Sequence, residues 1–224
     1  MEVILIRHTS VDVPPGVCYG QTDVPLKPTF EQEAAVTQEN LKAFLPFDHV
    51  YTSPLTRCVR LATYCGYPDA ERDKRIMEIN FGSWEMKPFD RNDDPRLQEW
   101  YADYLNVAAT GGESFAMQYR RVSDFLDELK GKPYQRVAVF AHGGVLICAQ
   151  IYAGIIKPEE AFSALTPYGG IVRIPLSTQK NEGITYIQVA VATTMITIIH
   201  STLRLIRTAI LMFSVVKGRS LSPI

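Results

Sequence analysis

Short apolar runs, separated by turn-forming residues, predict a set of buried strands along the chain. Residues 3–6 and 136–141 are rich in β-branched side chains and do not alternate with polar residues, which is typical of central strands covered on both faces. Residues 49–52 and 171–174 form two shorter runs, and residues 184–191 form a longer one. These five runs are the candidate strands of one sheet.

Segments with helical spacing lie between these runs. Thr29 and Gln32 have the spacing of a capping box, and Ser53 precedes Pro54 as an N-cap would. The predicted helices cover 29–44, a segment from Pro54 onward, 95–105, 113–129 and 145–155. Because strands alternate with helices, the predicted fold class is α/β, with three α/β/α layers and a mostly parallel central sheet.

Composition narrows the function classes without identifying one. The chain has 224 residues, 46% of them hydrophobic and 21% charged, with a formal net charge of −1. Because the net charge is close to zero, no overall positive potential indicates nucleic acid as a partner. Binding of an anionic ligand would therefore require a local cluster of cations. The four cysteines form no CxxC pair and have no metal-ligand spacing with the histidines. The N-terminus does not read as a signal peptide, and nothing before residue 187 is long and apolar enough for a membrane span, so the cytoplasm is the expected location.

Four short motifs carry candidate chemistry, although each is weak alone. They are LIRHTS at 5–10, YTSPLTR at 51–57, MEINFGSWE at 77–85 and VFAHGG at 139–144. His8 and His142 each follow a predicted buried strand, and ligands of open α/β sheets bind beyond the carboxyl ends of the strands. If the two strands are neighbours, the two histidines face each other across one crevice.

Taken together, the four motifs resemble the histidine phosphatase superfamily, which includes cofactor-dependent phosphoglycerate mutases and many small phosphatases. The family's RHG motif corresponds to Arg7, His8 and Thr9, its SPxxR motif runs from Ser53 to Arg57, and its second histidine is His142. Glu78 precedes an FGxWE-like stretch at 81–85, and the match covers residues 3–176. The resemblance implies a phosphoglycerate mutase-like fold.

The resemblance also implies a mechanism that requires neither a metal nor a cofactor. His8 would attack the phosphorus of a small phosphomonoester, and Arg7 and Arg57 would bind the phosphate through their planar forks of donors. His142 would supply further positive charge in the transition state, while Glu78 would protonate the leaving group. The resemblance also places Gly143 among the residues expected to bind the phosphate, together with Arg7, His8, Arg57 and His142. Two departures from the family pattern are Thr9 and Met86, since many members have glycine at both positions.

The loop at 16–26, GVCYGQTDVPL, narrows the resemblance to α-ribazole phosphatases, which act on a precursor of the cobalamin nucleotide loop. Tyr19, Gly20 and Gln21 would then flank the substrate by their position in this loop. Three alternatives stay open: the loop residues only shape a turn, the substrate is another small phosphomonoester or a phosphoglycerate, or the protein is an inactive phosphate-binding relative. The loop lacks the asparagine that mutases carry after the catalytic motif.

The last part of the chain does not resemble the family. The sequence divides into a predicted histidine phosphatase domain at 1–192 and an atypical apolar extension at 193–224. An apolar stripe with helical spacing runs through Met195, Ile199, Leu203, Ile206, Ile210 and Phe213. Arg204 and Arg207 interrupt this run and argue against a membrane span. The stripe is expected to cover apolar surface on its own domain or on a second subunit of a homodimer.

Overall fold

A five-stranded sheet is the centre of the computed structural model, which describes residues 1–89, 93–161 and 163–176. The strand order is β3-β2-β4-β1-β5, and β5 alone runs antiparallel to its neighbour. The mostly parallel sheet is therefore confirmed. The strands are β1 (Glu2–Arg7), β2 (His49–Thr52), β3 (Glu71–Arg72), β4 (Arg136–Ala141) and β5 (Ile171–Pro175).

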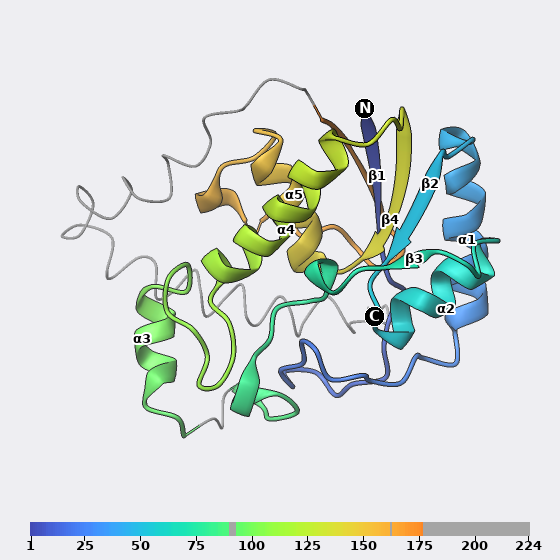
Figure 1. The fold of residues 1–224 in the computed structure, drawn as a ribbon. Coiled ribbons are helices and arrows are strands. Elements are labelled where there is room, and N and C mark those ends of the chain that lie inside the picture. The colour runs from blue at the N-terminus through green and yellow to red at the C-terminus, as the bar shows by residue number, and fades with distance from the viewer. Residues whose placement is uncertain (90–92, 162, 177–224) are drawn as a thin grey trace, which may run out of the picture.

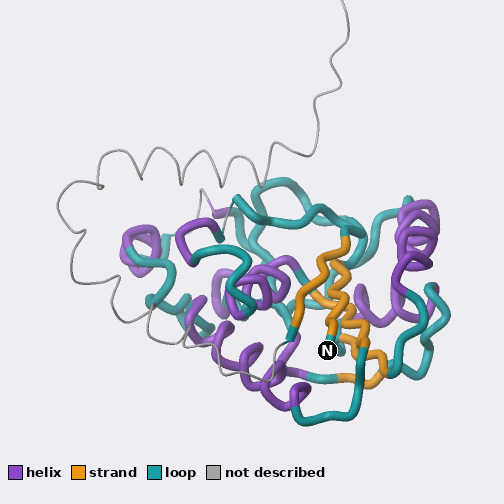
Figure 2. Tube along the Cα trace, turned by 90° about the horizontal axis from the view of Figure 1, so that it is seen from above, coloured by secondary structure: helices purple, strands orange, loops and turns teal. Residues whose placement is uncertain are grey.

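Helices cover both faces of the sheet. Figure 1 shows α1 and α2 on one side of the strands and α4 and α5 on the other, and Figure 2 shows the strands between helices from above. The α-helices are α1 (Phe30–Leu41), α2 (Thr56–Tyr64), α3 (Arg96–Ala102), α4 (Phe115–Lys130) and α5 (Gly143–Tyr152). The 3-10 turns are η1 (Lys42–Phe44), η2 (Lys74–Ile76), η3 (Gly82–Trp84) and η5 (Pro158–Glu160).

The alternation of side chains along β1 explains why its central residues, 3–6, are all apolar. Val3 and Leu5 are buried against α4 and α5, while Ile4 and Ile6 are buried in the cluster that contains α1 and α2. Each of these side chains contributes about 1.5–3 kcal/mol when it is fully buried. The part of a strand that is covered on both faces is apolar at successive positions, which is the pattern that predicted β1.

The helix boundaries correct two predicted caps. The Thr29 side chain makes no capping bond and instead donates from Oγ1 to Glu33 Oε1 at 2.7 Å. Helix α2 begins at Thr56, not at Pro54, and Leu55 occupies its N-cap position without a capping side chain. Capping by a side chain does occur at α4, where Ser114 accepts a hydrogen bond from the backbone N–H of Met117.

Other segments differ from the predictions by a few residues or lie outside the described part of the chain. Helix α5 begins at Gly143 rather than 145, because the two glycines of the motif lie inside its first turn. The strand predicted at 184–191, the extension at 193–224 and its apolar stripe all fall outside the described residues. Among the described helices, none is long and apolar enough to cross a membrane.

Candidate active site

His8 lies directly after β1, at the carboxyl end of the sheet. Its backbone N–H donates to the carbonyl of Ala141, the last residue of β4, at 3.1 Å. Its ring Nδ1 lies 2.7 Å from the carbonyl oxygen of Thr9, and because a carbonyl only accepts, Nδ1 carries the proton. The neutral ring therefore has its lone pair on Nε2.

The Thr9 departure does not distort this arrangement. Thr9 is fully buried, and Met86 is the one non-glycine residue with a positive φ in the described part of the chain, at 61°. Thr9 thus keeps a backbone conformation that any residue can adopt. The departure that does carry strain is Met86, which occupies the left-handed region that favours glycine.

His142 faces His8 as predicted, because β1 and β4 are parallel neighbours. The two ring centroids are 5.2 Å apart. Nδ1 of His142 accepts from Nε of Arg57 at 3.3 Å, so its ring proton is on Nε2, which lies 2.7 Å from Oγ of Ser53. Burial, reinforced by the charge of Arg57, lowers the pKa of His142 well below its usual 6.5. Ser53, predicted as a helix cap, thus holds His142 instead.

Arg57 extends from the first turn of α2 and is fully buried. Besides its bond to His142, its Nη1 donates to the carbonyl of Thr22 at 3.0 Å and its Nη2 donates to the carbonyl of Gly20 at 2.5 Å. Three of the five N–H groups of a guanidinium are therefore used by the protein. The charge of Arg57 is fixed beside His142 and tied to the loop at 20–22.

Arg7, the last residue of β1, has a buried donor without a protein partner. Its Nη1 donates to the carbonyl of Thr166 at 2.5 Å, whereas its buried Nε has no hydrogen-bond partner among the described residues. Leaving a buried donor of a charged group unpaired costs about 1–3 kcal/mol or more. An anion placed beside Nε would remove that cost. Arg7 and Arg57, together with the rings of His8 and His142, are referred to below as the cationic cluster, after the charge of the two arginines.

Glu78 approaches the cluster from the segment after η2. Its Oε1 accepts from the backbone N–H of Ile79 and from Nε2 of Gln118, both at 2.9 Å. Its Oε2 accepts from the backbone N–H of Gly144, in the first turn of α5, at 3.2 Å. A Cβ on Gly144 would lie 2.4 Å from Oε1, so the carboxylate fits there only against glycine. Since Oε1 already accepts two bonds, Oε2 is the oxygen better able to carry a proton.

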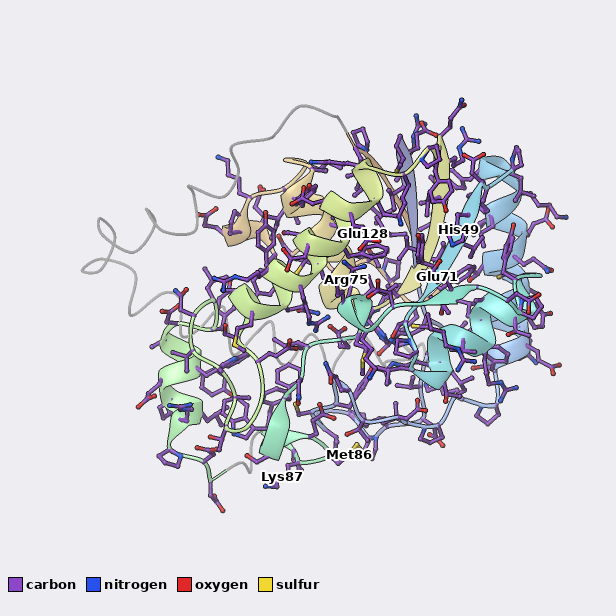
Figure 3. The ribbon with its side chains drawn as sticks, in the orientation of Figure 1. His49, Glu71, Arg75, Met86, Lys87 and Glu128 are labelled. Carbon is purple, nitrogen blue, oxygen red and sulfur yellow. The ribbon has the colours of Figure 1, made fainter. Side chains whose placement is uncertain are left out.

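Helix α4 holds the backbone of the Glu78 segment. Arg121 donates from Nη1 to the carbonyls of Arg75 and Met77, and from Nη2 to the carbonyl of Glu78 at 2.9 Å. Arg75 in turn forms an ion pair with Glu128 at 2.9 Å, and Figure 3 shows the two side chains where η2 meets α4. These bonds fix Glu78 relative to the sheet.

A cavity of about 180 Å³ adjoins the cationic cluster and has two unlike ends. The polar end contains Arg7, His8, Glu78, Gln118, Gly143 and Gly144. The other end, called the aromatic pocket below, is lined by residues 14–18 and by Phe81, Phe89, Trp100, Tyr104 and Phe115. Within the described lining, the formal charges are confined to the polar end.

The loop residues predicted to flank the substrate take different places. Tyr19 lines the cavity, and its hydroxyl lies 2.6 Å from that of Tyr168. Gly20 presents its carbonyl to Arg57. The side chain of Gln21 donates from Nε2 to the carbonyl of Glu78 at 3.0 Å. The loop therefore connects Arg57 to the Glu78 segment, in addition to any contact with a ligand.

Cys18, Cys58, Cys65 and Cys148 are free thiols. Within the described ranges, no three His, Cys, Asp or Glu residues are grouped as they would be around a metal ion.

Sequence reasoning missed Gln118 and Tyr168, which both line the cavity. Gln118 could have been found, because it is a polar residue in line with the buried positions Val122, Phe125 and Leu129 of α4. Tyr168 lies in a turn-rich segment and gives no such signal.

Comparison with known proteins agrees with the fold and with the predicted family. The sequence profile of the histidine phosphatase superfamily (branch 1) matches residues 3–186. Phosphoserine phosphatase 1 of Hydrogenobacter thermophilus (strain DSM 6534 / IAM 12695 / TK-6) is 27% identical over 154 residues, covering 63% of this chain and 71% of the relative. The phosphatase PhoE of Bacillus subtilis (strain 168) is 37% identical over 150 residues, covering 64% and 72%.

Solved structures show the same fold. The crystal structure of the α-ribazole phosphatase from Shigella flexneri superposes with a TM-score of 0.67 at 24% identity, covering 80% of this chain and 92% of that one.

Proposed function

The chain belongs to branch 1 of the histidine phosphatase superfamily, and we propose that it hydrolyses a small phosphomonoester through a phosphohistidine formed on Nε2 of His8. One observation carries this proposal above the others. The bond from Nδ1 of His8 to the carbonyl of Thr9 leaves the ring lone pair on Nε2, within the cationic cluster. A neutral, oriented imidazole beside fixed guanidinium groups is what nucleophilic attack on a phosphate dianion requires.

The first step transfers the phosphoryl group from substrate to protein. Nε2 of His8 forms a bond to phosphorus while the bond from phosphorus to the leaving oxygen breaks. Glu78 delivers a proton from Oε2 to that oxygen, so the product leaves as a neutral alcohol. Nε of Arg7 and the remaining N–H groups of Arg57 stabilise the charge on the transferring oxygens, and Gly143 borders the same space.

The second step regenerates the protein. Water attacks the phosphorus of phosphohistidine, Glu78 accepts the proton of that water, and inorganic phosphate leaves while the lone pair returns to Nε2. The positive charge comes from side chains throughout, so the proposed mechanism uses no metal or cofactor. Binding of the dianion favours the charged form of His142, which burial disfavours in the empty site.

The aromatic pocket and the loop at 16–26 support α-ribazole 5′-phosphate as the substrate. This compound has an uncharged aromatic base joined to the sugar that carries the phosphate, and a pocket lined by Phe81, Phe89 and Trp100 suits such a group. Phosphoserine, by contrast, carries a carboxylate and an ammonium group, and the aromatic pocket offers neither charge a partner. The same argument disfavours phosphoglycerate and hence a mutase.

Of the two alternatives, one keeps a specific basis and one does not. Another small phosphomonoester with an apolar leaving group fits the same pocket, and the relative named for phosphoserine is the reason to include that substrate in the test. An inactive phosphate-binding relative would have no chemical need for Glu78 held within reach of the cavity by Gln118 and Gly144.

Phosphate release from p-nitrophenyl phosphate in the presence of EDTA tests the hydrolase and its independence of metal. We expect turnover in the wild type, turnover lost to background in His8→Ala, and wild-type turnover in His49→Asn as the histidine control. Acid-quenched protein should carry acid-labile phosphate on His8. Acid-stable label on Ser10 or Ser53 would contradict the mechanism.

A substrate panel then tests the substrate. We expect α-ribazole 5′-phosphate to have the highest kcat/KM, above phenyl phosphate, phosphoserine and 3-phosphoglycerate. A higher value for phosphoserine would overturn the substrate assignment but leave the hydrolase intact.

A further inference from the structure

The segment from Thr166 to Gly170, just before β5, wraps around the carboxyl end of β1. The backbone N–H of Gly169 donates to the carbonyl of His8 at 3.1 Å, and the backbone N–H of Arg7 donates to the carbonyl of Gly170 at 3.0 Å. The Arg7 side chain donates from Nη1 to the carbonyl of Thr166. This segment therefore contacts both the nucleophile and its neighbouring cation.

The shape of the turn is fixed by a close approach to α1. Gly169 has a φ of 68°, and a Cβ at this position would lie 2.6 Å from Oγ1 of Thr37. That hydroxyl, buried on α1, lies 3.1 Å from the carbonyl of Gly169. Glycine fits both the backbone conformation and the space at this position, and in this turn the neighbouring Tyr168 lines the cavity.

Tyr168 contacts three parts of the site at once. Its ring covers the guanidinium of Arg7, with Cζ 4.0 Å from the ring centroid. The ring centroid lies 5.5 Å from that of His8, and the hydroxyl lies 2.6 Å from the hydroxyl of Tyr19. A planar guanidinium stacks well on an aromatic face, so the Tyr168 ring limits the orientations that Arg7 can take.

We propose that Tyr168 is a positioning residue that holds the Arg7 guanidinium in the plane needed to bind phosphate, an inference that rests on the proposed function. The Thr166 carbonyl occupies Nη1 and the Tyr168 ring covers one face of the guanidinium. The edge formed by Nε and Nη2 is then directed at the substrate, and Nε is the donor that has no partner in the described protein. Two parallel bonds to one phosphate require this edge to be fixed.

The hydroxyl bond gives the same residue a second contact. Tyr19 belongs to the loop whose residues 14–18 line the aromatic pocket. Because Tyr168 touches Arg7 with its ring and Tyr19 with its hydroxyl, it joins the phosphate-binding end to the wall of the aromatic pocket. The ring and the hydroxyl can be removed separately, so the two contacts can be tested separately.

The first experiment measures binding of inorganic phosphate by calorimetry, which does not depend on turnover. Tyr168→Leu removes the ring and is expected to weaken phosphate binding about tenfold, whereas Tyr168→Phe keeps the ring and should stay within about twofold of the wild type. Tyr152→Phe, which removes a tyrosine hydroxyl bonded to Asp127 on α4, is the control and should bind phosphate as the wild type does. Tyr168→Met serves as a second ring-free variant if Tyr168→Leu does not fold.

A double-mutant cycle with Arg7→Lys then separates positioning from general packing. Once Arg7 is replaced, Tyr168→Leu should cost less than about twofold in phosphate affinity, because there is no guanidinium to orient. Full additivity of the two losses, or unchanged affinity in a folded ring-free variant, would overturn the inference. Failure of the wild type to release phosphate while it still binds phosphate would instead count against the proposed function alone.

The kinetic constants test the contact with Tyr19. Tyr168→Phe and Tyr19→Phe should each raise KM for phenyl phosphate by a few fold with kcat little changed, and the double variant should match either single one. Additive effects of the two substitutions would contradict a shared hydrogen bond.

Discussion

The cationic cluster and the aromatic pocket share one cavity but are built in opposite ways. Arg7, His8 and His142 lie at the ends of two neighbouring parallel strands, and Arg57 lies in the first turn of the helix after a third. Their polar atoms are held by backbone carbonyls and by one another. The aromatic pocket is formed by the loop at 14–18, by the region around η3 and α3, and by the first residue of α4.

This difference assigns the chemical step to the cationic cluster and the choice of substrate to the aromatic pocket. Strand ends are fixed by the sheet ladder on both sides, so they can hold charged groups at constant distances from a reacting phosphorus atom. Loops and short helices can vary without disturbing that ladder, and binding specificity commonly lies there. Substitutions in the cluster should therefore change the rate for every phosphomonoester, whereas substitutions in the aromatic pocket should change the ranking of substrates.

Glu78 lies at the polar end of the cavity, and its replacement should have a larger effect than the substitutions of Arg57, His142 and Phe89 that follow. We expect Glu78→Gln to lower kcat for phenyl and alkyl phosphates by about 10²–10⁴-fold, because their leaving oxygens need a proton. The loss for p-nitrophenyl phosphate should be much smaller, since nitrophenolate leaves without protonation. Steady-state kinetics on both substrates provides the measurement, with Glu71→Gln, an exposed carboxylate on β3 (Figure 3), as the control. Equal losses on both substrates would remove Glu78 from the acid role.

Arg57→Lys tests whether geometry matters in the cluster as well as charge. A lysine keeps the positive charge but cannot donate at once to His142, to the loop carbonyls and to phosphate, so we expect kcat/KM to fall by about tenfold or more. Inhibition by inorganic phosphate should weaken in parallel. Arg60→Lys, one turn further along α2 and exposed, is the matched control. An unchanged phosphate inhibition constant would place Arg57 outside the binding site.

The buried His142 should make folding stability depend on pH. Its pKa is lowered in the folded protein, whereas the unfolded chain titrates near the ordinary value of about 6.5. Below that pH the unfolded state binds more protons, so this residue's contribution to the free energy of unfolding is complete above 6.5. It is lost, by up to about 1.4 kcal/mol per pH unit, as the pH falls toward the folded value.

Urea unfolding at a series of pH values measures this slope. His142→Asn should flatten it, and His49→Asn should leave it unchanged. Inorganic phosphate should also reduce the slope, because a bound anion favours the charged ring. A slope that survives in His142→Asn would assign the pH dependence to other groups.

The difference between strand ends and loops also explains which site residues could be predicted from the sequence. His8 and His142 follow apolar runs long enough to be read as buried strands, and parallel pairing of β1 with β4 brings them together. Arg57 and Glu78 were found through motif spacing. A short local pattern fixes the two histidines and Arg57 relative to the sheet, whereas Glu78 is held by long-range bonds from Gln118 and Gly144.

Tyr168, Trp100 and Phe115 had no such pattern. They come from three separate segments that meet only after the sheet and helices have packed, so no local spacing relates them. The failed cap at Ser53 has a related cause. Its hydroxyl could satisfy a helix N–H or a histidine ring, and tertiary packing places the ring of His142 at 2.7 Å. Long-range contacts decide such choices, and they are not visible in local sequence.

The smallest expected effect, and the most specific, belongs to the aromatic pocket. Phe89 is half-buried, and its ring lies 5.9 Å from that of Phe81 and 6.1 Å from that of Trp100. Phe89→Leu keeps an apolar side chain but removes one aromatic face, which contributes about 0.5–1.5 kcal/mol beyond its buried area. We therefore expect KM for phenyl phosphate and α-ribazole 5′-phosphate to rise by about threefold to tenfold, with little change in kcat or in the phosphate inhibition constant. Phosphoserine, which has no aromatic group, should be hydrolysed by the variant as it is by the wild type.

Phe47→Leu replaces a half-buried phenylalanine that packs on Tyr67 and does not line the cavity, so it controls for the loss of an aromatic side chain as such. If Phe89→Leu lowered kcat for every substrate equally, the aromatic pocket would be part of the catalytic apparatus, and the separation of chemistry from specificity would fail.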